Sequence, residues 1–199
     1  MTERSWRNVF FKNRGTLLAL PAVSLVVFGR PTAASFAIGM PLALAGEALR
    51  CWAVGYSGVT TRSDRVVAPQ LVTAGPYAYV RNPLYVGNFI TAVGFTLVFV
   101  GGVSPTRRTL LALTGLGTML AVYAAIVPLE ETYLRETFGA PFDAYVASVP
   151  RIVPRLAPIA EAQGAYDASV IARAETRTFV TFGAMFVAAI VKALRRARS

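Results

Sequence analysis

The chain has 199 residues, of which 55% are hydrophobic and only 15% are charged. The apolar residues gather in long blocks rather than at amphipathic spacing. This pattern is typical of a polytopic membrane protein, and we expect no hydrophobic core of the kind found in soluble proteins. The net charge of +10 could indicate nucleic-acid binding, but the basic residues flank the apolar blocks and form no patch interleaved with aromatics. Anionic lipid head groups are therefore the expected charged partner, and no nucleic acid is expected.

Five apolar segments predict an all-α membrane bundle of about five helices, with residues 1–199 forming a single integral membrane domain. In chain order they run from Leu17 to Phe28, Ala33 to Tyr56, Leu84 to Val103, Leu110 to Val127, and Phe179 to Val191. The first and last are short for a bilayer core, which asks for about 20 residues. The last segment, within a C-terminal helix over about 177–194, is expected to be either a fifth span or a helix buried against the others.

Basic residues predict which ends of the helices face the cytoplasm. The stretch from Met1 to Gly15 is both basic and aromatic, so we expect an interfacial anchor rather than a cleavable signal peptide. Lys and Arg recur between Ser57 and Asn82 and again after Pro128. By the positive-inside rule, we expect these segments to lie on the cytoplasmic side of a bacterial inner membrane. A fifth span would put the basic C-terminus outside, against that rule. Gly164 to Thr176 is expected to form an amphipathic interfacial helix before the last one.

Two polar segments flank a predicted helical hairpin. The first, Gly75 to Gly87, reads G-P-Y-A-Y-V-R-N-P-L-Y-V-G, and the second, Pro128 to Gly139, is predicted to be helical, with Gly139 at its C-cap. A glycine- and proline-containing turn between the two central apolar runs makes them antiparallel. Because each run climbs roughly 30 Å, both polar segments return to one side of the membrane, and Arg81 and Glu130 are expected to be neighbours.

The residue inventory excludes several chemistries. The chain has no histidine and one cysteine, Cys51. There is consequently no histidine general base, no Ser-His-Asp arrangement and no His- or Cys-based metal centre, and we expect no bound metal. No glycine-rich nucleotide loop of the Walker or G-x-G-x-x-G type is present either.

The polar groups that remain can bind a zwitterion. They are Tyr77, Arg81, Asn82 and Tyr85 in the first segment, Glu130 and Glu131 in the second, and Arg151 beyond it. Arginine and amide donors suit a carboxylate, and carboxylates suit an ammonium group or ribose hydroxyls. We expect Glu130 to contact the bound molecule and Glu131 to pair with Arg135 one helical turn away.

Each of these residues also has a plain structural interpretation. Glu131 and Arg135 can be a simple surface pair, and Arg81 a positive-inside anchor. Glu47 and Arg50, one turn apart near a helix end, can neutralise each other. We favour a binding site because polar groups gather at both ends of one hairpin. At a membrane boundary, such groups cost free energy unless a ligand binds to them.

The two segments resemble a known family. Gly75-Pro76-Tyr77 followed by Val80-Arg81-Asn82-Pro83-Leu84-Tyr85-Val86-Gly87 is similar to the first signature of the isoprenylcysteine carboxyl methyltransferase and phospholipid methyltransferase superfamily. Glu130-Glu131, Leu134, Phe138-Gly139, Tyr145 and Val149-Pro150-Arg151 resemble the second. The resemblance covers about residues 45–155. It implies an integral membrane enzyme that moves a methyl group from S-adenosylmethionine to a lipophilic acceptor.

Carried over by position, the resemblance implies a set of site residues. Those that would bind S-adenosylmethionine are Tyr77, Val80, Arg81, Asn82, Pro83, Tyr85, Gly87, Glu130 and Glu131, and those that would act in catalysis are Arg151 and Glu131. The family usually has histidine where this chain has Asn82. An amide can donate a hydrogen bond but cannot carry a proton charge at physiological pH, so any proton-transfer role there is in doubt.

Two other functions stay open at this stage. Sterol reductases have a somewhat similar membrane region that binds NADPH, but their pattern has glutamate where this chain has Asn88. A non-catalytic protein that binds lipid head groups is the second alternative, and Asn82 is its main support. The acceptor group, whether carboxylate, amine, thiol or hydroxyl, and the oligomeric state do not follow from the sequence.

Overall fold

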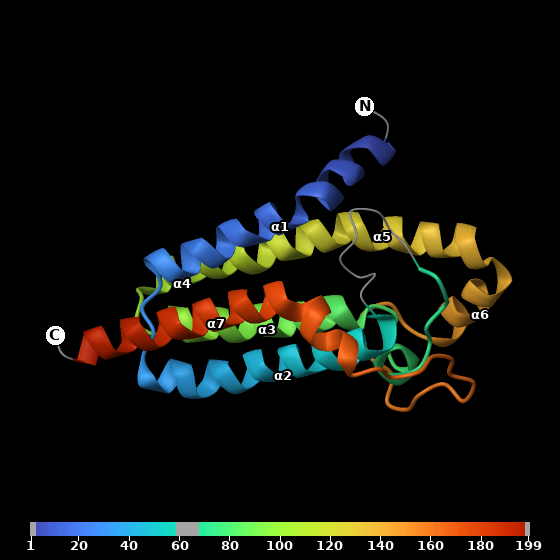
Figure 1. Cartoon of the computed structure of the whole chain (residues 1–199). Helices are drawn as coiled ribbons and strands as arrows, with labels where there is room; N and C mark the ends of the chain where they lie inside the picture. Colours follow the sequence, from blue (N-terminus) through green and yellow to red (C-terminus); the bar gives the residue numbers. More distant parts are fainter. Residues whose placement is uncertain (1–2, 59–67, 198–199) are drawn as a thin grey trace.

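The computed structural model describes residues 3–58 and 68–197, and these contain helices and coil but no strand. The elements are α1 (Glu3–Phe28), α2 (Ala33–Ser57), the short 3-10 helix η2 (Gly75–Ala78), α3 (Pro83–Val100), α4 (Pro105–Ala112), the π-helical stretch η3 (Leu113–Gly117), α5 (Thr118–Phe138), α6 (Ala140–Ser148) and α7 (Ser169–Ala197). The long helices run lengthwise beside one another, and α6 lies across one end of the bundle (Figure 1). The predicted all-α membrane bundle is confirmed.

Helices α2 and α3 pack with their backbones in close approach, because glycines face each other across the contact. A Cβ added to Gly39 would lie 2.4 Å from the carbonyl oxygen of Gly94, and one added to Gly46 would lie 2.5 Å from the amide nitrogen of Thr91. Small residues at such contacts are a common basis of helix association in membranes, where apolar burial alone gives little driving force. This pair has the most extensive helix–helix contact among the described residues.

The predicted hairpin is confirmed. Gly101 to Ser104 forms the turn after α3, and Ser104 caps α4 by accepting a hydrogen bond from the amide of Arg107 at 3.4 Å. The chain then continues through η3 into α5 as one helical run from Pro105 to Phe138. Gly139, with φ of 58°, ends α5 as predicted, and α6 begins directly after it with a proline in its first turn. The start of α3 and the end of α5 therefore meet at one end of the bundle.

Four helical runs are long and apolar enough to cross a membrane: α2, α3, the run from Pro105 to Phe138, and Ser169 to Arg196 in α7. The apolar part of α1, Asn13 to Phe28, is shorter than this criterion requires. The predicted shortness of the last helix is wrong: α7 starts at Ser169 and absorbs the stretch to Thr176 that we expected as a separate interfacial helix. Only residues 164–168 of that stretch are coil.

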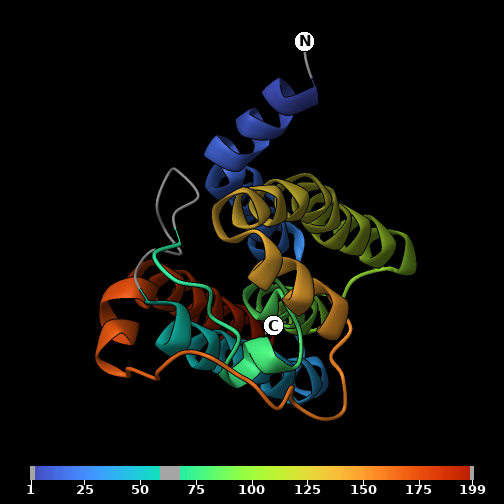
Figure 2. The ribbon, with the colours of Figure 1, turned by 90° about the vertical axis from the view of Figure 1, so that its right-hand side faces the viewer.

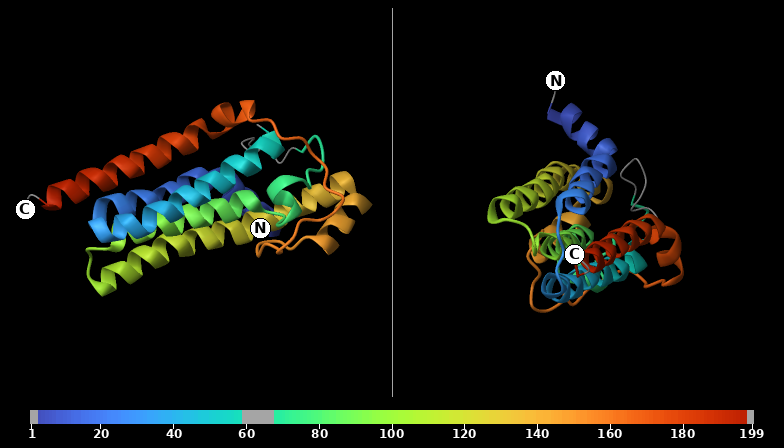
Figure 3. Two further views of the ribbon diagram at one scale, coloured as in Figure 1. Left: turned by 90° about the horizontal axis from the view of Figure 1, so that it is seen from below. Right: turned by 90° about the vertical axis from the view of Figure 1, so that its left-hand side faces the viewer.

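The helices around the central pair define the space that matters for function. Seen from the end where α6 lies, α1 and α5 lie on one side of α3, and α2 and α7 on the other (Figure 2). Helix α7 runs along one margin of the bundle (Figure 3, left), and only 11% of its apolar window is buried. Residues 59–67, part of the segment predicted to be cytoplasmic, lie outside the described residues, as do the side chains of the N-terminal basic stretch up to Lys12.

Candidate functional site

The first polar segment turns sharply before α3. Gly75 has φ of 61° and opens η2, and a Cβ at this position would lie 2.2 Å from the ring of Tyr56. Positive φ together with this close approach explains why glycine stands there. Asn82 then occupies the N-cap position of α3, with Pro83 in the first helical turn, where its missing N–H is harmless.

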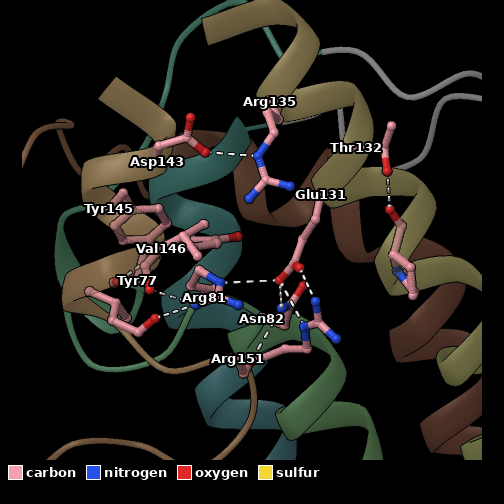
Figure 4. Close-up of polar contacts among 12 residues, drawn as sticks. Tyr77, Arg81, Asn82, Glu131, Thr132, Arg135, Asp143, Tyr145, Val146 and Arg151 are labelled. Atoms are coloured by element: carbon pink, nitrogen blue, oxygen red, sulfur yellow. Dashed lines mark hydrogen bonds and ion pairs between the residues drawn. The ribbon is translucent and has the colours of Figure 1, made fainter. Parts of the chain in front are cut away.

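Glu131 of α5 is the centre of the polar site (Figure 4). Its Oε1 accepts hydrogen bonds from Arg81 Nε at 3.1 Å, from Arg151 Nε at 3.1 Å and from Asn82 Nδ2 at 3.4 Å. Its Oε2 accepts a second bond from Arg151 at 2.5 Å. The Glu131 side chain is buried, so two guanidinium groups compensate its charge where water does not.

Further hydrogen bonds tie the first segment to α6 and the chain that follows it. Arg81 Nη1 donates to the carbonyl oxygens of Val146, at 3.1 Å, and Val149, at 2.5 Å. The Tyr145 hydroxyl donates to the carbonyl oxygen of Tyr77 at 2.7 Å. Burial raises the pKa of Tyr145 above its usual range and that of Tyr77 to about 12, so both phenols stay protonated at physiological pH.

The neighbouring carboxylate, Glu130, lies apart from this cluster. Its Oε1 accepts a hydrogen bond from the Tyr85 hydroxyl at 2.8 Å, and the Tyr85 ring packs edge-on against that of Tyr123 at 4.5 Å. Consecutive helical residues point about 100° apart, so the two glutamates face different neighbours. Arg81 and Glu130 lie at the same end of the bundle, but the carboxylate that Arg81 binds is Glu131, one residue further along α5.

The predicted pair of Glu131 with Arg135 is wrong. Arg135 Nε instead donates to Asp143 Oδ1 of α6 at 2.7 Å, on the exposed side of α5. Helix α6 supplies that carboxylate because Gly139 turns the chain back toward α5. Arg135 was predicted to pair within α5, and its partner lies instead in the next helix.

A cavity of about 770 Å³ extends from the polar site along α3. At the polar end it is lined by Tyr77, Arg81, Asn82, Pro83, Tyr85, Glu130 and Glu131. Farther along α3 come Asn88 and then Phe95, and α1 and α7 add Leu25, Phe182 and Met185. Glu47, Arg50 and Arg177 also line the cavity, near Asn88, so that a second charged region lies between the Glu131 site and the apolar residues. A polar end and an apolar end suit a molecule with a polar head and an apolar chain.

Three of the predicted site residues do not line this cavity. Val80 is buried and borders a smaller groove with Trp52 and Pro154. Gly87 faces α2, where an added Cβ would lie 2.8 Å from Arg50 Cγ, so it permits helix packing. The Arg151 side chain is half exposed and reaches the cavity region only through its bonds to Glu131.

The structure adds a buried polar cluster that the sequence analysis only partly identified. Arg50 of α2 donates to Asn88 Oδ1, to Glu175 Oε2 at 2.6 Å and to Thr178 Oγ1 at 3.4 Å, and its Nε lies 3.8 Å from Glu47. Glu175 is fully buried. Glu47 and Arg50 are therefore not a self-contained pair. The signal that could have identified Glu175 is an acidic residue next to the last apolar run.

Arg14 of α1 also lines the cavity, although the sequence analysis considered it only as part of an interfacial anchor. Its position on the first helix brings a further cation toward the polar end.

Together the fold and the site define a helical membrane protein with a polar cluster at one end of a long amphiphilic cavity. The sequence model of the phospholipid methyltransferase family matches residues 34–141, more than half of the chain. The chain therefore belongs to the phospholipid methyltransferase family.

Three relatives show how this similarity is distributed. A nickel-cobalt-cadmium resistance protein, NccN, of Alcaligenes xylosoxydans xylosoxydans is 38% identical over 44% of this chain and 37% of its own. The protein-S-isoprenylcysteine O-methyltransferase of Schizosaccharomyces pombe is 36% identical over 42% of this chain and 33% of its own. Protein-S-isoprenylcysteine O-methyltransferase B of Arabidopsis thaliana is 29% identical over 58% of this chain and 57% of its own. The chain thus spans less than two thirds of the length of each. No solved structure matches it significantly.

Proposed function

We propose that the chain is an integral membrane methyltransferase that moves a methyl group from S-adenosylmethionine to a lipophilic acceptor. The observation that carries this proposal is the Glu131 cluster, which joins both family signature segments at the polar end of a cavity that becomes apolar along α3. The membership in the phospholipid methyltransferase family and the similarity to isoprenylcysteine methyltransferases support it.

The residues at the polar end fit a zwitterionic cofactor. The cavity, at about 770 Å³, lies within the roughly 300–1,000 Å³ of typical small-molecule sites. Glu131 and Arg81 already bind each other, so their role is to position the segments. Glu130 accepts one hydrogen bond, from Tyr85, and has acceptor capacity left for an ammonium group or a ribose hydroxyl. Asn82 and Tyr77 line the same end.

For methyl transfer, the main task of the protein is to position the methyl donor and the acceptor. S-adenosylmethionine, when bound, supplies the methyl group of its sulfonium, whose positive charge disappears on transfer. The chain has to align donor and acceptor and keep water out, and it needs no nucleophile of its own. Glu131 would hold the polar side chains at this end of the cavity in place. Arg151, which is half exposed, would cover the same end from the solvent side. Phe95 and Phe182, whose rings pack at 4.9 Å, would contact the acyl or prenyl chain of the acceptor.

The distribution of basic residues supports a proposal for the position in the cell. Lys and Arg are more frequent on the side of the two signature segments, so we place the polar end of the cavity in the cytoplasm of a bacterial cell, and the helices in its inner membrane. The metal-resistance relative does not redirect the proposal to metal binding. The chain has no histidine, and its described residues hold no group of three potential metal ligands.

Calorimetric titration of the purified protein in lipid nanodiscs tests the proposal. S-adenosylmethionine and its demethylated product, S-adenosylhomocysteine, are expected to bind, and NADPH is not. Binding of NADPH alone would favour the reductase alternative, and binding of none of the three would favour a non-catalytic lipid-binding protein. Comparing lipid extracts of cells with and without the gene, for species heavier by one methyl group, would then identify the acceptor.

A further inference from the structure

An exposed apolar edge lies beside the polar site but outside the cavity. It consists of Trp52 near the end of α2 and of Ile152, Val153 and Leu156 in the coil between α6 and α7. These side chains are 42%, 46%, 75% and 104% exposed, respectively. Several large apolar side chains together on a surface mark a contact with another apolar phase or molecule. We call this set the apolar edge.

The coil that carries the edge is held firmly. Arg155 donates its amide to the carbonyl oxygen of Tyr79 at 3.0 Å, and its side chain donates to the carbonyl oxygen of Ser148 at 3.0 Å. The amide of Ile159 bonds to the carbonyl oxygen of Ala78 at 3.2 Å. Prolines at 150, 154 and 158 further restrict the backbone. The hydrogen bonds and prolines thus fix the backbone of the coil, and this backbone holds the aliphatic side chains on the surface.

The two arginines beside the edge make hydrogen bonds to the protein. Arg151 binds Glu131, and Arg155 binds a backbone carbonyl of the α6 end. The side chains exposed between these two arginines are Ile152 and Val153, and Leu156 is exposed directly after them. A coil facing water would show the opposite arrangement, since long basic side chains are the groups that water solvates best.

The edge lies alongside the membrane-spanning part of α2. Pro154 shares a groove of about 200 Å³ with Leu49 and Trp52 of α2 and with Tyr79, whose ring lies 6.3 Å from that of Trp52. Leu49 precedes the last residue of α2, Ser57, by eight positions, which is about 12 Å along a helix. The groove thus opens beside the last turns of a span, where the coil approaches the end of α2 (Figure 1).

The same face of α2 is apolar along its length. Ile38 and Leu44 are 67% and 53% exposed, and the stripe they begin ends at Trp52. In a helix that crosses a bilayer, such a stripe faces lipid. The groove that Pro154 shares with Leu49 and Trp52 brings the coil of the apolar edge to the end of this stripe. Tryptophan and tyrosine are the residues enriched where acyl chains meet head groups.

We propose that the apolar edge inserts into the bilayer at the boundary between head groups and acyl chains, with a lipid acyl segment in the groove beside Trp52. The partner is thus the lipid of the membrane that the helices cross. Because Ile152 directly follows Arg151, the bilayer would hold the coil in the position from which Arg151 binds Glu131. The inference does not depend on the reaction that the site performs.

A fluorescence quenching experiment tests the insertion. In a Cys51→Ala background, Leu156→Cys is labelled with a nitrobenzoxadiazole dye and reconstituted in nanodiscs. The matched control is Glu161→Cys, which lies five residues on in the same coil and is also exposed. The probes are iodide in the water and phosphatidylcholine with a spin label high on its acyl chain.

The expected result is that spin-labelled lipid quenches the dye at 156 several-fold more than the dye at 161, and that iodide shows the reverse. Equal iodide quenching at the two positions would overturn the proposal, because it would put the edge in water. Protection of position 156 from both quenchers would overturn it too, because a protein contact would then cover the edge. Both cysteine variants alter exposed side chains, so folding is not at stake.

Discussion

At the scale of single residues, the two adjacent glutamates of α5 have different surroundings. Glu131 binds Arg81, Arg151 and Asn82, whereas Glu130 binds only the Tyr85 hydroxyl among the contacts described. Glu131 therefore ties the two polar segments together, and Glu130 is the carboxylate that we propose contacts the ligand.

Glu131→Gln removes the charge that two guanidinium groups share. Each lost charge-assisted bond is worth about 1.5–3 kcal/mol, so the affinity for S-adenosylhomocysteine should fall by roughly tenfold or more, with a lower Tm. Calorimetric titration and thermal unfolding measure both effects. Glu136→Gln, five residues on at an exposed position of the same helix, is the control and should change neither. Unaltered affinity in folded Glu131→Gln would refute the central position of this carboxylate.

Asn82 distinguishes a working site from one that has lost its activity. Its amide donates to Glu131 Oε1 and, at 3.2 Å, to the carbonyl oxygen of Arg151. Asn82→Ala should therefore weaken cofactor binding by about 0.5–1.5 kcal/mol, while Asn82→His should be tolerated, since the family usually has that ring. The three proteins are titrated with S-adenosylhomocysteine at one pH. Equal affinity of wild type and alanine variant would remove Asn82 from the site.

The residue types of the site could be predicted, but their pairing could not. Polar segments at both ends of a hairpin identify Arg81, Asn82, Glu131 and Arg151 as neighbours. The choice between Glu130 and Glu131 depends on the helix phase, and one residue changes the direction of a side chain by about 100°. That phase is set by the packing of α5 against α1 and α3, which the local sequence does not encode.

At the scale of the elements, the contact between α2 and α3 depends on glycines. A Cβ at Gly94 would lie 2.4 Å from the amide nitrogen of Ala43, whereas one at Gly183 of α7 would meet nothing within 4 Å. Gly94→Ala should consequently lower the Tm by several degrees, because two backbones would have to separate. Gly183→Ala, the matched control, should leave the Tm unchanged or raise it, since alanine favours helix. Similar unfolding temperatures for the two variants would argue against the close α2–α3 contact.

Helix α7 makes polar contacts with the bundle near its two ends, in addition to the apolar packing of Met185 and Ala189 in the core. Near its start, Glu175 binds Arg50, and near its end Lys192 Nζ donates to the carbonyl oxygens of Val26 and Val27, at 2.5 and 3.0 Å. Between these contacts, Thr178, Phe182 and Met185 line the cavity. The helix therefore forms one wall of the cavity, although little of its surface is buried.

Glu175→Gln should loosen this wall. Removing one partner of a buried ion pair costs about 3–5 kcal/mol, and the Tm should fall by several degrees or more. Arg173→Gln, at an exposed position two residues earlier, should have no such effect. Thermal unfolding in nanodiscs measures both variants. A Tm equal to that of the wild type for Glu175→Gln would mean that the ion pair does not anchor α7.

The elements themselves followed from the sequence more reliably than their ends did. Long apolar runs and the Gly139 C-cap predicted α2, the hairpin and the end of α5 correctly. The stretch up to Thr176 was predicted to be helical, but as a separate interfacial helix. In the structure it continues without a break into α7 from Ser169 onward, and Glu175 within it binds Arg50.

At the scale of the whole molecule, the cavity is built from more of the chain than the family model covers. Residues 34–141 supply the polar end and the α3 wall. Helices α1 and α7, which lie outside that range, supply Leu25, Phe182 and Met185 at the apolar end. The apolar end, where we propose that the acceptor chain binds, is thus formed partly by residues outside the region that the family model matches.

The central claim is that the whole chain transfers a methyl group to a lipophilic molecule, and one measurement tests it most directly. Membranes that contain the wild-type protein are incubated with S-adenosylmethionine carrying a radioactive methyl group and extracted with organic solvent. The account predicts label in the organic phase above the level of membranes without the protein, and its loss in Glu131→Gln. Label at the background level, in membranes whose protein binds S-adenosylmethionine, would contradict it.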